Sequence, residues 1–261
     1  MIGLGSTASK NPTVKKTIVR DGLVLRHDYK DRPVEPVSSG AASFIASSND
    51  SITTSNDTGL RPGAGSFSVS CWVNSNQKGT SAFALGKADN TDTTAGVGTG
   101  FALYLGNVGT DWIFWVADGT DRAITATTTE ANANQWYHLC GTFDTSGTDT
   151  VRLYVDGVLI NSSAQALDTV DVSNNLEIGR IAGVATNDWD GYICNVGFWK
   201  GVVLTQPQIK SIMHKDYAAL SASEKTNLVS WWNLDEETAT DGTTGTGGVK
   251  DHEGSNHGTL E

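Results

Sequence analysis

The residues best suited to chemistry in this sequence are carboxylates grouped in short polar loops. Asp89 and Asp92 lie in one such loop, and Asp188 and Asp190 lie in another. Loop carboxylates are typical ligands of Ca²⁺, so both loops are candidate calcium sites. The alternative is turn chemistry, because Asp and Asn favour loops by hydrogen bonding to the local backbone. The sequence predicts no cofactor other than a possible calcium ion.

Aromatic side chains indicate a second kind of site. The chain has eight tryptophans, and the faces of their rings can stack on sugar rings. Three of them lie in alternating segments and are expected in the core, namely Trp72, Trp136 and Trp199. The assignment of Trp231 and Trp232 stays open. The candidate glycan-binding residues are Trp112, Trp115 and Trp189. For each candidate the alternative is a place in the core, where most large aromatic side chains lie.

Charge is distributed unevenly along the chain, whose formal net charge is −11. Residues 1–32 hold seven basic and three acidic residues, whereas residues 221–261 hold eight acidic residues and two lysines. An acidic body would repel phosphate, so nucleic acid is not an expected partner. A basic arm suits an acidic protein surface, and a solvated tail is the alternative. The candidate partner-binding residues are Lys10, Lys15, Lys16 and Arg20.

The cellular setting is inferred from cysteines and apolar runs. Cys71, Cys140 and Cys194 have no close pairs and lie in strand-like segments, which predicts buried free thiols. The N-terminus does not resemble a signal peptide, and no apolar run is long enough to span a membrane. We therefore expect synthesis in a reducing compartment and no membrane partner.

The alternation of apolar and polar residues predicts an all-β fold. Residues 66–73 alternate strictly, and the Asp156-Gly157 pair between two apolar runs predicts a hairpin. Thr205, with Gln208 three residues later, predicts the start of one short helix. The expected fold is a two-sheet antiparallel jelly-roll β-sandwich with one short C-terminal helix and extended terminal arms. Its expected core includes Phe67, Val69, Cys71, Leu153, Val155 and Ile178.

Several segments resemble the laminin-G-like jelly roll of the concanavalin A-like lectin/glucanase superfamily. They have the order and spacing of that family, and they are residues 67–73, 136–144, 151–158, 176–179, 190–199 and 204–209. The resemblance covers about residues 20–220. It implies a domain over 23–220, after a basic arm over 1–22 and before an acidic segment over 221–261 with an added strand.

The acidic C-terminal segment carries a further resemblance. Residues 228–235 and 249–260 are similar to the opening strand of the same family. This apolar strand is expected to pair with a sheet, because unpaired strand edges seek partners. Pairing within its own domain, beside residues 23–29, is favoured over pairing with a neighbouring copy, since local closure costs little entropy.

The resemblance does not extend to catalysis. Glucanases of this fold share a Glu-x-Asp-x-Glu strand whose carboxylates perform retaining hydrolysis, and the chain has no such triplet. Asp188 and Asp190 have no third acid, and the contiguous acids of residues 235–237 would point to both faces of a strand. The five histidines have no close metal-binding spacing. The sequence therefore predicts a protein that is not an enzyme.

Two functions of different classes fit these features. The first is a virion structural protein, a decoration protein on a bacteriophage capsid, made in the host cytoplasm. It would bind other virion proteins or copies of itself, because the terminal segments have opposite charge. The alternative is a carbohydrate-binding module or tail-fibre adhesin that recognises a surface glycan. Two or more exposed aromatic residues beside Asp or Asn on an open face would favour the alternative.

Overall fold

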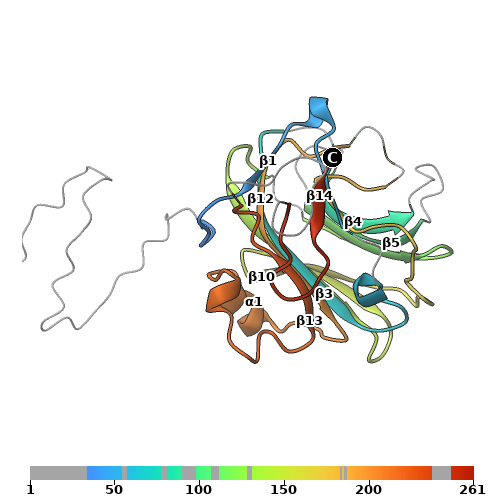
Figure 1. Ribbon diagram of the computed structural model, residues 1–261. Coiled ribbons are helices and arrows are strands. Elements are labelled where there is room, and N and C mark those ends of the chain that lie inside the picture. The colour runs from blue at the N-terminus through green and yellow to red at the C-terminus, as the bar shows by residue number, and fades with distance from the viewer. Residues whose placement is uncertain are drawn as a thin grey trace, which may run out of the picture. The chain divides into compact units, whose positions relative to one another are not determined.

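Two antiparallel sheets lie face to face in the computed structural model of the protein (Figure 1). The structure describes residues 34–54, 58–77, 81–89, 98–106, 112–127, 131–182, 184, 187–236 and 248–261. Within these ranges each sheet has seven strands, so the predicted all-β sandwich is confirmed. The basic arm lies outside the described residues, and with it Lys10, Lys15, Lys16 and Arg20.

One sheet, called sheet A, is built around the long strand β12. Its strands are, in spatial order, β1 (Ala42–Phe44), β12 (Gly191–Lys200), β3 (Phe67–Ser75), β8 (Trp136–Asp144), β9 (Thr150–Val155) and β10 (Val158–Ala164). β13 (Leu228–Trp232) also pairs with β12, along the second half of that strand, while β1 pairs with the first half. The β9–β10 hairpin turns at Asp156 and Gly157, both at positive φ, as a type I′ turn requires.

The opposing sheet, called sheet B, has short strands at one edge and longer strands at the other. Its order is β14 (Gly258–Leu260), β2 (Ile52–Thr54), β11 (Glu177–Ile178), β4 (Ala82–Asp89), β5 (Thr99–Leu105), β6 (Trp112–Asp118) and β7 (Arg122–Ala126). Two 3₁₀ turns, η1 (Ala46–Ser48) and η2 (Thr58–Leu60), flank β2. No helix among the described residues has the length and hydropathy needed to cross a membrane.

The core lies between the inner faces of the two sheets. Five of the six residues predicted to form it are fully buried, and the sixth, Val155, is half-buried against them. Phe67 is central, because its ring lies 4.8 to 6.3 Å from those of Phe101, Phe114, Phe143 and Phe198. The three cysteines are free and buried, as predicted. Burial raises the pKa of the Cys194 thiol to about 12, so this thiol stays protonated at neutral pH.

A second apolar layer covers part of the outer face of sheet A. It is formed by α1 (Gln206–Ile212), by the 3₁₀ turn η3 (Tyr217–Ala219) and by the residues that follow them. The indole of Trp72 donates to the Met213 carbonyl at 2.9 Å, and that of Trp199 donates to the Glu224 carbonyl at 2.8 Å. These two tryptophans are therefore buried, as expected, but under this layer rather than between the sheets.

The acidic C-terminal segment is part of both sheets of its own chain. β13 pairs with β12 in sheet A, and β14 pairs with β2 in sheet B. The added strand therefore pairs within its own chain, with β12, while the partner predicted for it, residues 23–29, lies outside the described residues. The turn between β13 and β14 is organised by the Asp251 carboxylate, which accepts hydrogen bonds from the backbone N–H groups of Trp231, Glu253, Gly254 and Asn256.

The layer over sheet A is held partly by one ion pair. The carboxylate of Glu224, which is 5% exposed, accepts hydrogen bonds from Lys215 Nζ at 2.6 and 2.7 Å and from Ser221 N at 2.7 Å. Burial would raise the pKa of Glu224, but hydrogen bonds from Lys215, Ser211 and Ser221 outweigh burial and lower the pKa from 4.5 to about 2. The charged form of Glu224 therefore stabilises the fold.

This depressed pKa gives the protein a pH-dependent stability. The contribution of Glu224 is fully present above its unfolded pKa of 4.5 and is lost as the pH falls towards 2. We expect Glu224→Gln to lower the Tm above pH 4.5, and the difference from the wild type to shrink as the pH approaches 2. Thermal unfolding across this range measures the effect, with exposed Asp121→Asn as the control. A constant Tm difference would contradict the assignment.

Candidate functional site

A row of side chains crosses the outer face of sheet A at the end where β12 begins. Ser43 of β1 lies opposite Tyr192 of β12, Tyr192 lies opposite Asn74 of β3, and Asn74 lies opposite Trp136 of β8. Directly opposed residues project from the same face of a sheet, so the four side chains are neighbours. The neighbouring row of Val73 and Ile193 points the other way, into the core. We call Trp136, Asn74 and Tyr192 the aromatic row.

The two rings of the aromatic row are partly open to solvent. Tyr192 is 43% exposed and Trp136 is half-buried. Their ring centroids are 6.4 Å apart with planes tilted by 42°. Strands β8 and β12 are two strand spacings apart, about 9.6 Å, so the rings must lean towards each other over Asn74. They form a tilted aromatic platform across β3.

Asn74 supplies an unused polar group beneath this platform. Its Oδ1 atom is buried and has no hydrogen-bond partner among the described residues. An acceptor buried without a partner costs about 1–3 kcal/mol, and a ligand hydroxyl that reached this atom would remove that cost. The aromatic row thus combines flat apolar surface with an unsatisfied acceptor.

Polar loop residues surround the same end of sheet A. The Asn76 side chain donates to Asp190 Oδ1 at 3.4 Å, and the Asn76 backbone N–H donates to the Asp190 carbonyl at 2.9 Å. In the loop before β8, Asn132 Nδ2 donates to Gln135 Oε1 at 3.1 Å. Gln135 directly precedes Trp136, and Asp190 lies two residues before Tyr192, so we call these two residues the polar rim of the platform. A few polar groups around an apolar surface are what orient a small ligand.

The structure places the loop acids predicted to bind calcium in different surroundings. Asp89 is exposed at the end of β4, Asp190 belongs to the polar rim, and Asp92 lies outside the described residues. Asp188 is 4% exposed, and its Oδ1 is 3.9 Å from Arg180 Nε. Burial raises the pKa of Asp188, against an opposing effect of Arg180. This carboxylate faces Arg180 at ion-pair distance without a hydrogen bond between them, and calcium binding at the two loops stays a prediction.

The tryptophans chosen as glycan ligands are buried. Trp112 and Trp189 are 2% and 0% exposed and lie in the central core, with ring centroids 6.2 Å apart. Trp115 is 6% exposed and packs on the outer face of sheet B with Ile181 and Val184. Indole faces covered in this way are not available for stacking on a sugar. The structure therefore supports the alternative that these three tryptophans are buried packing residues.

Trp136 differs from its prediction in the other direction, because it is more exposed than expected. It was expected in the core, but it lies at the start of β8, where it packs against Trp72, Cys194 and Met213 and stays half-buried. Tyr192 was not singled out from the sequence at all. Strand alternation around Tyr192 indicates an outward side chain, but only the register across β12, β3 and β8 reveals its aromatic neighbour.

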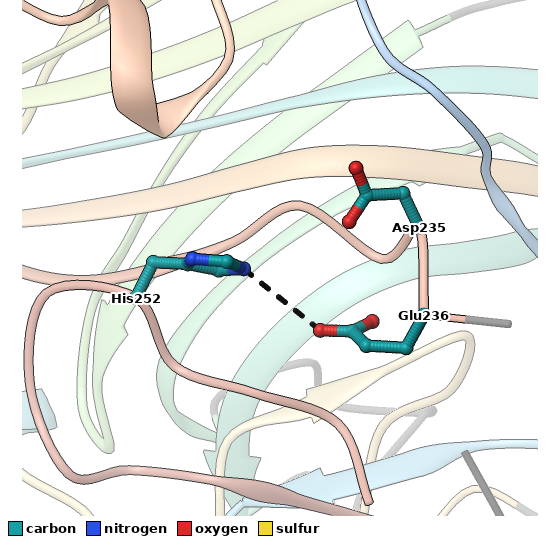
Figure 2. Close-up of side chains that lie close together, drawn as sticks. All are labelled: Asp235, Glu236 and His252. Carbon is teal, nitrogen blue, oxygen red and sulfur yellow. Dashed lines mark ion pairs between the residues drawn. The ribbon is translucent and has the colours of Figure 1, made fainter. Parts of the chain in front are cut away.

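A separate group of titratable side chains lies near the C-terminal strands (Figure 2). Asp235 and Glu236 follow β13, and His252 belongs to the turn before β14. Burial lowers the pKa of His252, and Lys250 adds to this effect while nearby acids oppose it. Asp235 and Glu236 also line a cavity of about 540 Å³ between β1 at the edge of sheet A and β14 at the edge of sheet B.

Comparison with known proteins gives one family. A family model described as the concanavalin A-like lectin/glucanases superfamily matches residues 46–210. No curated protein matches the sequence.

Solved structures provide neighbours in fold. A putative carbohydrate binding protein from Bacteroides ovatus is 22% identical, with a TM-score of 0.63 over 85% of this chain and 57% of that chain. The chain therefore spans just over half of that protein. The CBM40 of the IT-sialidase of Ruminococcus gnavus, bound to alpha2,3 sialyllactose, is 11% identical, with a TM-score of 0.49 over 70% of this chain and 100% of that chain. At these identities the likeness is one of fold.

Proposed function

The chain belongs to the concanavalin A-like lectin/glucanase superfamily, and on that premise we propose that it is a non-catalytic module that binds a carbohydrate at the aromatic row. One observation carries the proposal: two partly exposed rings, 6.4 Å apart, flank a buried amide oxygen that has no partner. Tyr192 is exposed and Trp136 is half-buried beside Asn74, so the row meets in part the arrangement that favours carbohydrate binding over assembly.

The chemistry of the aromatic row suits a sugar. The C–H faces of a pyranose ring are apolar and pack on aromatic faces, while its hydroxyls need hydrogen-bond partners. Trp136 and Tyr192 supply the aromatic faces, and the polar rim at Asp190 can hold hydroxyls. Asn74 Oδ1 is buried beneath the rings and would accept from a hydroxyl once Tyr192 moves aside. Stacking and hydrogen bonding together would select a sugar over a purely apolar ligand.

The aromatic row lacks the groups needed for hydrolysis. Glycoside hydrolysis uses two carboxyl groups on either side of the scissile bond, about 5–9.5 Å apart. The row consists of two aromatic residues and an amide, and Asp190 beside it is hydrogen-bonded to Asn76. Binding without turnover is the function that this composition supports.

The virion role rests on different residues. This hypothesis was based on the opposite charges of the two terminal segments, and the basic N-terminal segment lies outside the described residues. The acidic one forms β13 and β14 within its own sheets, which removes it as a free intermolecular arm. A decoration role on a bacteriophage particle therefore stays a prediction, and a glycan-binding surface is compatible with it.

Glycan binding can be tested with the whole chain on an array of oligosaccharides, followed by calorimetric titration of the best ligand. We expect Trp136→Ala and Tyr192→Ala each to weaken binding by about tenfold or more, because buried aromatic anchors dominate binding energy. Ile124→Ala is the matched control, since it removes an exposed apolar side chain from sheet B. Failure of the array to show any ligand, or wild-type affinity in both row variants, would refute the proposal.

A further inference from the structure

The group formed by Asp235, Glu236 and His252 brings together ligand atoms from two parts of the chain. One carboxylate oxygen from each acid and one imidazole nitrogen all lie within 4.8 Å of one another. Figure 2 shows the imidazole directed towards the two carboxylates, with His252 Nε2 at 3.9 Å from Glu236 Oε1. We call these three residues the Asp-Glu-His cluster.

The backbone fixes the cluster in place. The two acids lie three and four residues after the end of β13, which is paired with β12, and the His252 N–H donates to the Trp231 carbonyl of β13 at 2.8 Å. Each carboxylate is also oriented: Ser39 Oγ donates to Asp235 Oδ2 at 2.5 Å, and the Lys250 N–H donates to Glu236 Oε1 at 3.0 Å. Because these side chains are already held in place, binding of a cation would cost little side-chain conformational entropy.

The third ligand atom of the cluster, His252 Nε2, has no hydrogen-bond partner among the described residues. This nitrogen is also buried. Two adjacent carboxylates repel each other, and a buried imidazole nitrogen without a partner is costly. One cation between them would relieve both effects. Asp235 and Glu236 also line the cavity between β1 and β14, from which a cation could approach the two acids.

We propose that the Asp-Glu-His cluster binds a divalent transition-metal ion of the zinc class. Ca²⁺ and Mg²⁺ prefer oxygen ligands throughout, whereas an imidazole nitrogen with carboxylates suits Zn²⁺. Three protein ligands with water in the fourth position form a common zinc arrangement. Ligand bonds of about 2.0–2.1 Å put tetrahedral neighbours about 3.3 Å apart. The 3.9 Å between His252 Nε2 and Glu236 Oε1 would have to shorten by about 0.6 Å, and the other ligand pairs, all within 4.8 Å, by up to about 1.5 Å.

The ion would act as a clamp on the C-terminal strands. It would link Glu236, four residues after the end of β13, to His252 in the turn before β14. These strands belong to opposite sheets, so the ion would tie the edge of sheet A to the edge of sheet B. An ion that binds only the folded state stabilises it by mass action. This role is independent of carbohydrate binding at the aromatic row.

The test uses the whole purified chain, treated with a chelator and then titrated with ZnCl₂. We expect one Zn²⁺ per chain and a Tm rise of about 5–10 °C at 100 times the Kd. Glu236→Gln and His252→Gln should each weaken Zn²⁺ binding by about tenfold or more, since each removes one of three ligands. Glu236→Gln keeps an oxygen that can accept from Lys250 N, so it should remain folded. His214→Gln is the control, because it removes an exposed histidine elsewhere.

A second probe separates this cluster from other metal-binding residues. Co²⁺ bound at an imidazole-containing tetrahedral site absorbs visible light, and this absorption should appear in the wild type and in His214→Gln. It should be absent in His252→Gln. Loss of the signal in that variant, with its circular dichroism unchanged, would support the site. No stoichiometric Zn²⁺ binding, a Ca²⁺ affinity equal to that for Zn²⁺, or unchanged Co²⁺ absorption in His252→Gln would each overturn the proposal.

Discussion

Deletion of residues 227–261 is expected to unfold the sandwich rather than shorten it. The deletion removes β13 from sheet A and β14 from sheet B, and it exposes the edges of β12 and β2. It also removes Trp231 and Trp232, which are 1% and 0% exposed. Replacing one buried tryptophan by alanine costs about 3–5 kcal/mol, whereas a domain is stable by about 5–15 kcal/mol in total. The loss therefore approaches the whole stability of the domain.

A single substitution gives the same test with a milder change. Trp232 joins β13 to the last turn, because its indole donates to the Asn256 carbonyl at 2.8 Å. We expect Trp232→Ala to lower the Tm by about 10 °C, at about 2–4 °C per kcal/mol for a domain of this size. Tyr192→Ala, on the exposed face, should change the Tm by only about 1–2 °C. A truncated chain that unfolds cooperatively at the wild-type Tm would show that β13 and β14 are not integral to the sheets.

Substitution of Gly191 by alanine is expected to damage both stability and the aromatic row. Gly191 has a φ of +135°, a region that side chains rarely adopt, and a Cβ placed there would lie 2.1 Å from the Asn74 carbonyl oxygen. To remove this clash, β12 must move away from β3 next to the position where Tyr192 lies opposite Asn74. Backbone strain of about 1–3 kcal/mol plus the displacement predicts a loss of about 3 kcal/mol or more.

Urea unfolding measures the stability of Gly191→Ala, and calorimetry measures its affinity for the glycan. Gly147→Ala is a matched control, because a Cβ at Gly147 meets nothing within 4 Å. We expect the control to match the wild type in both measurements. If Gly191→Ala keeps wild-type stability and glycan affinity, the close approach of β12 and β3 does not shape the site.

Local features of the fold followed from the sequence because they depend on neighbours along the chain. Strand alternation placed Phe67, Val69 and Cys71 in the core, and all three are fully buried. The Asp156-Gly157 pair predicted the β9–β10 hairpin, since both positions need positive φ. The spacing of Thr205 and Gln208 predicted the start of α1, where the Thr205 N–H donates to Gln208 Oε1 at 2.9 Å.

The candidate site needed the tertiary structure, because exposure depends on what covers each face. Alternation assigns a side chain to one face of a strand but does not show whether another element packs on that face. For this reason Trp112, Trp115 and Trp189, considered for glycans, are buried, while Trp136, expected in the core, is only half-buried.

Local sequence patterns also did not predict which distant residues come into contact. Local patterns predicted an all-β sandwich with one short helix, buried thiols and a C-terminal strand that pairs with a sheet. Three further features emerged from the packing of distant segments: the pairing of that strand with β12, the meeting of Tyr192 and Trp136 over Asn74, and the approach of His252 to Glu236. The physical reason is that register and sheet order are set by packing between segments far apart in the chain, which a local periodicity does not encode.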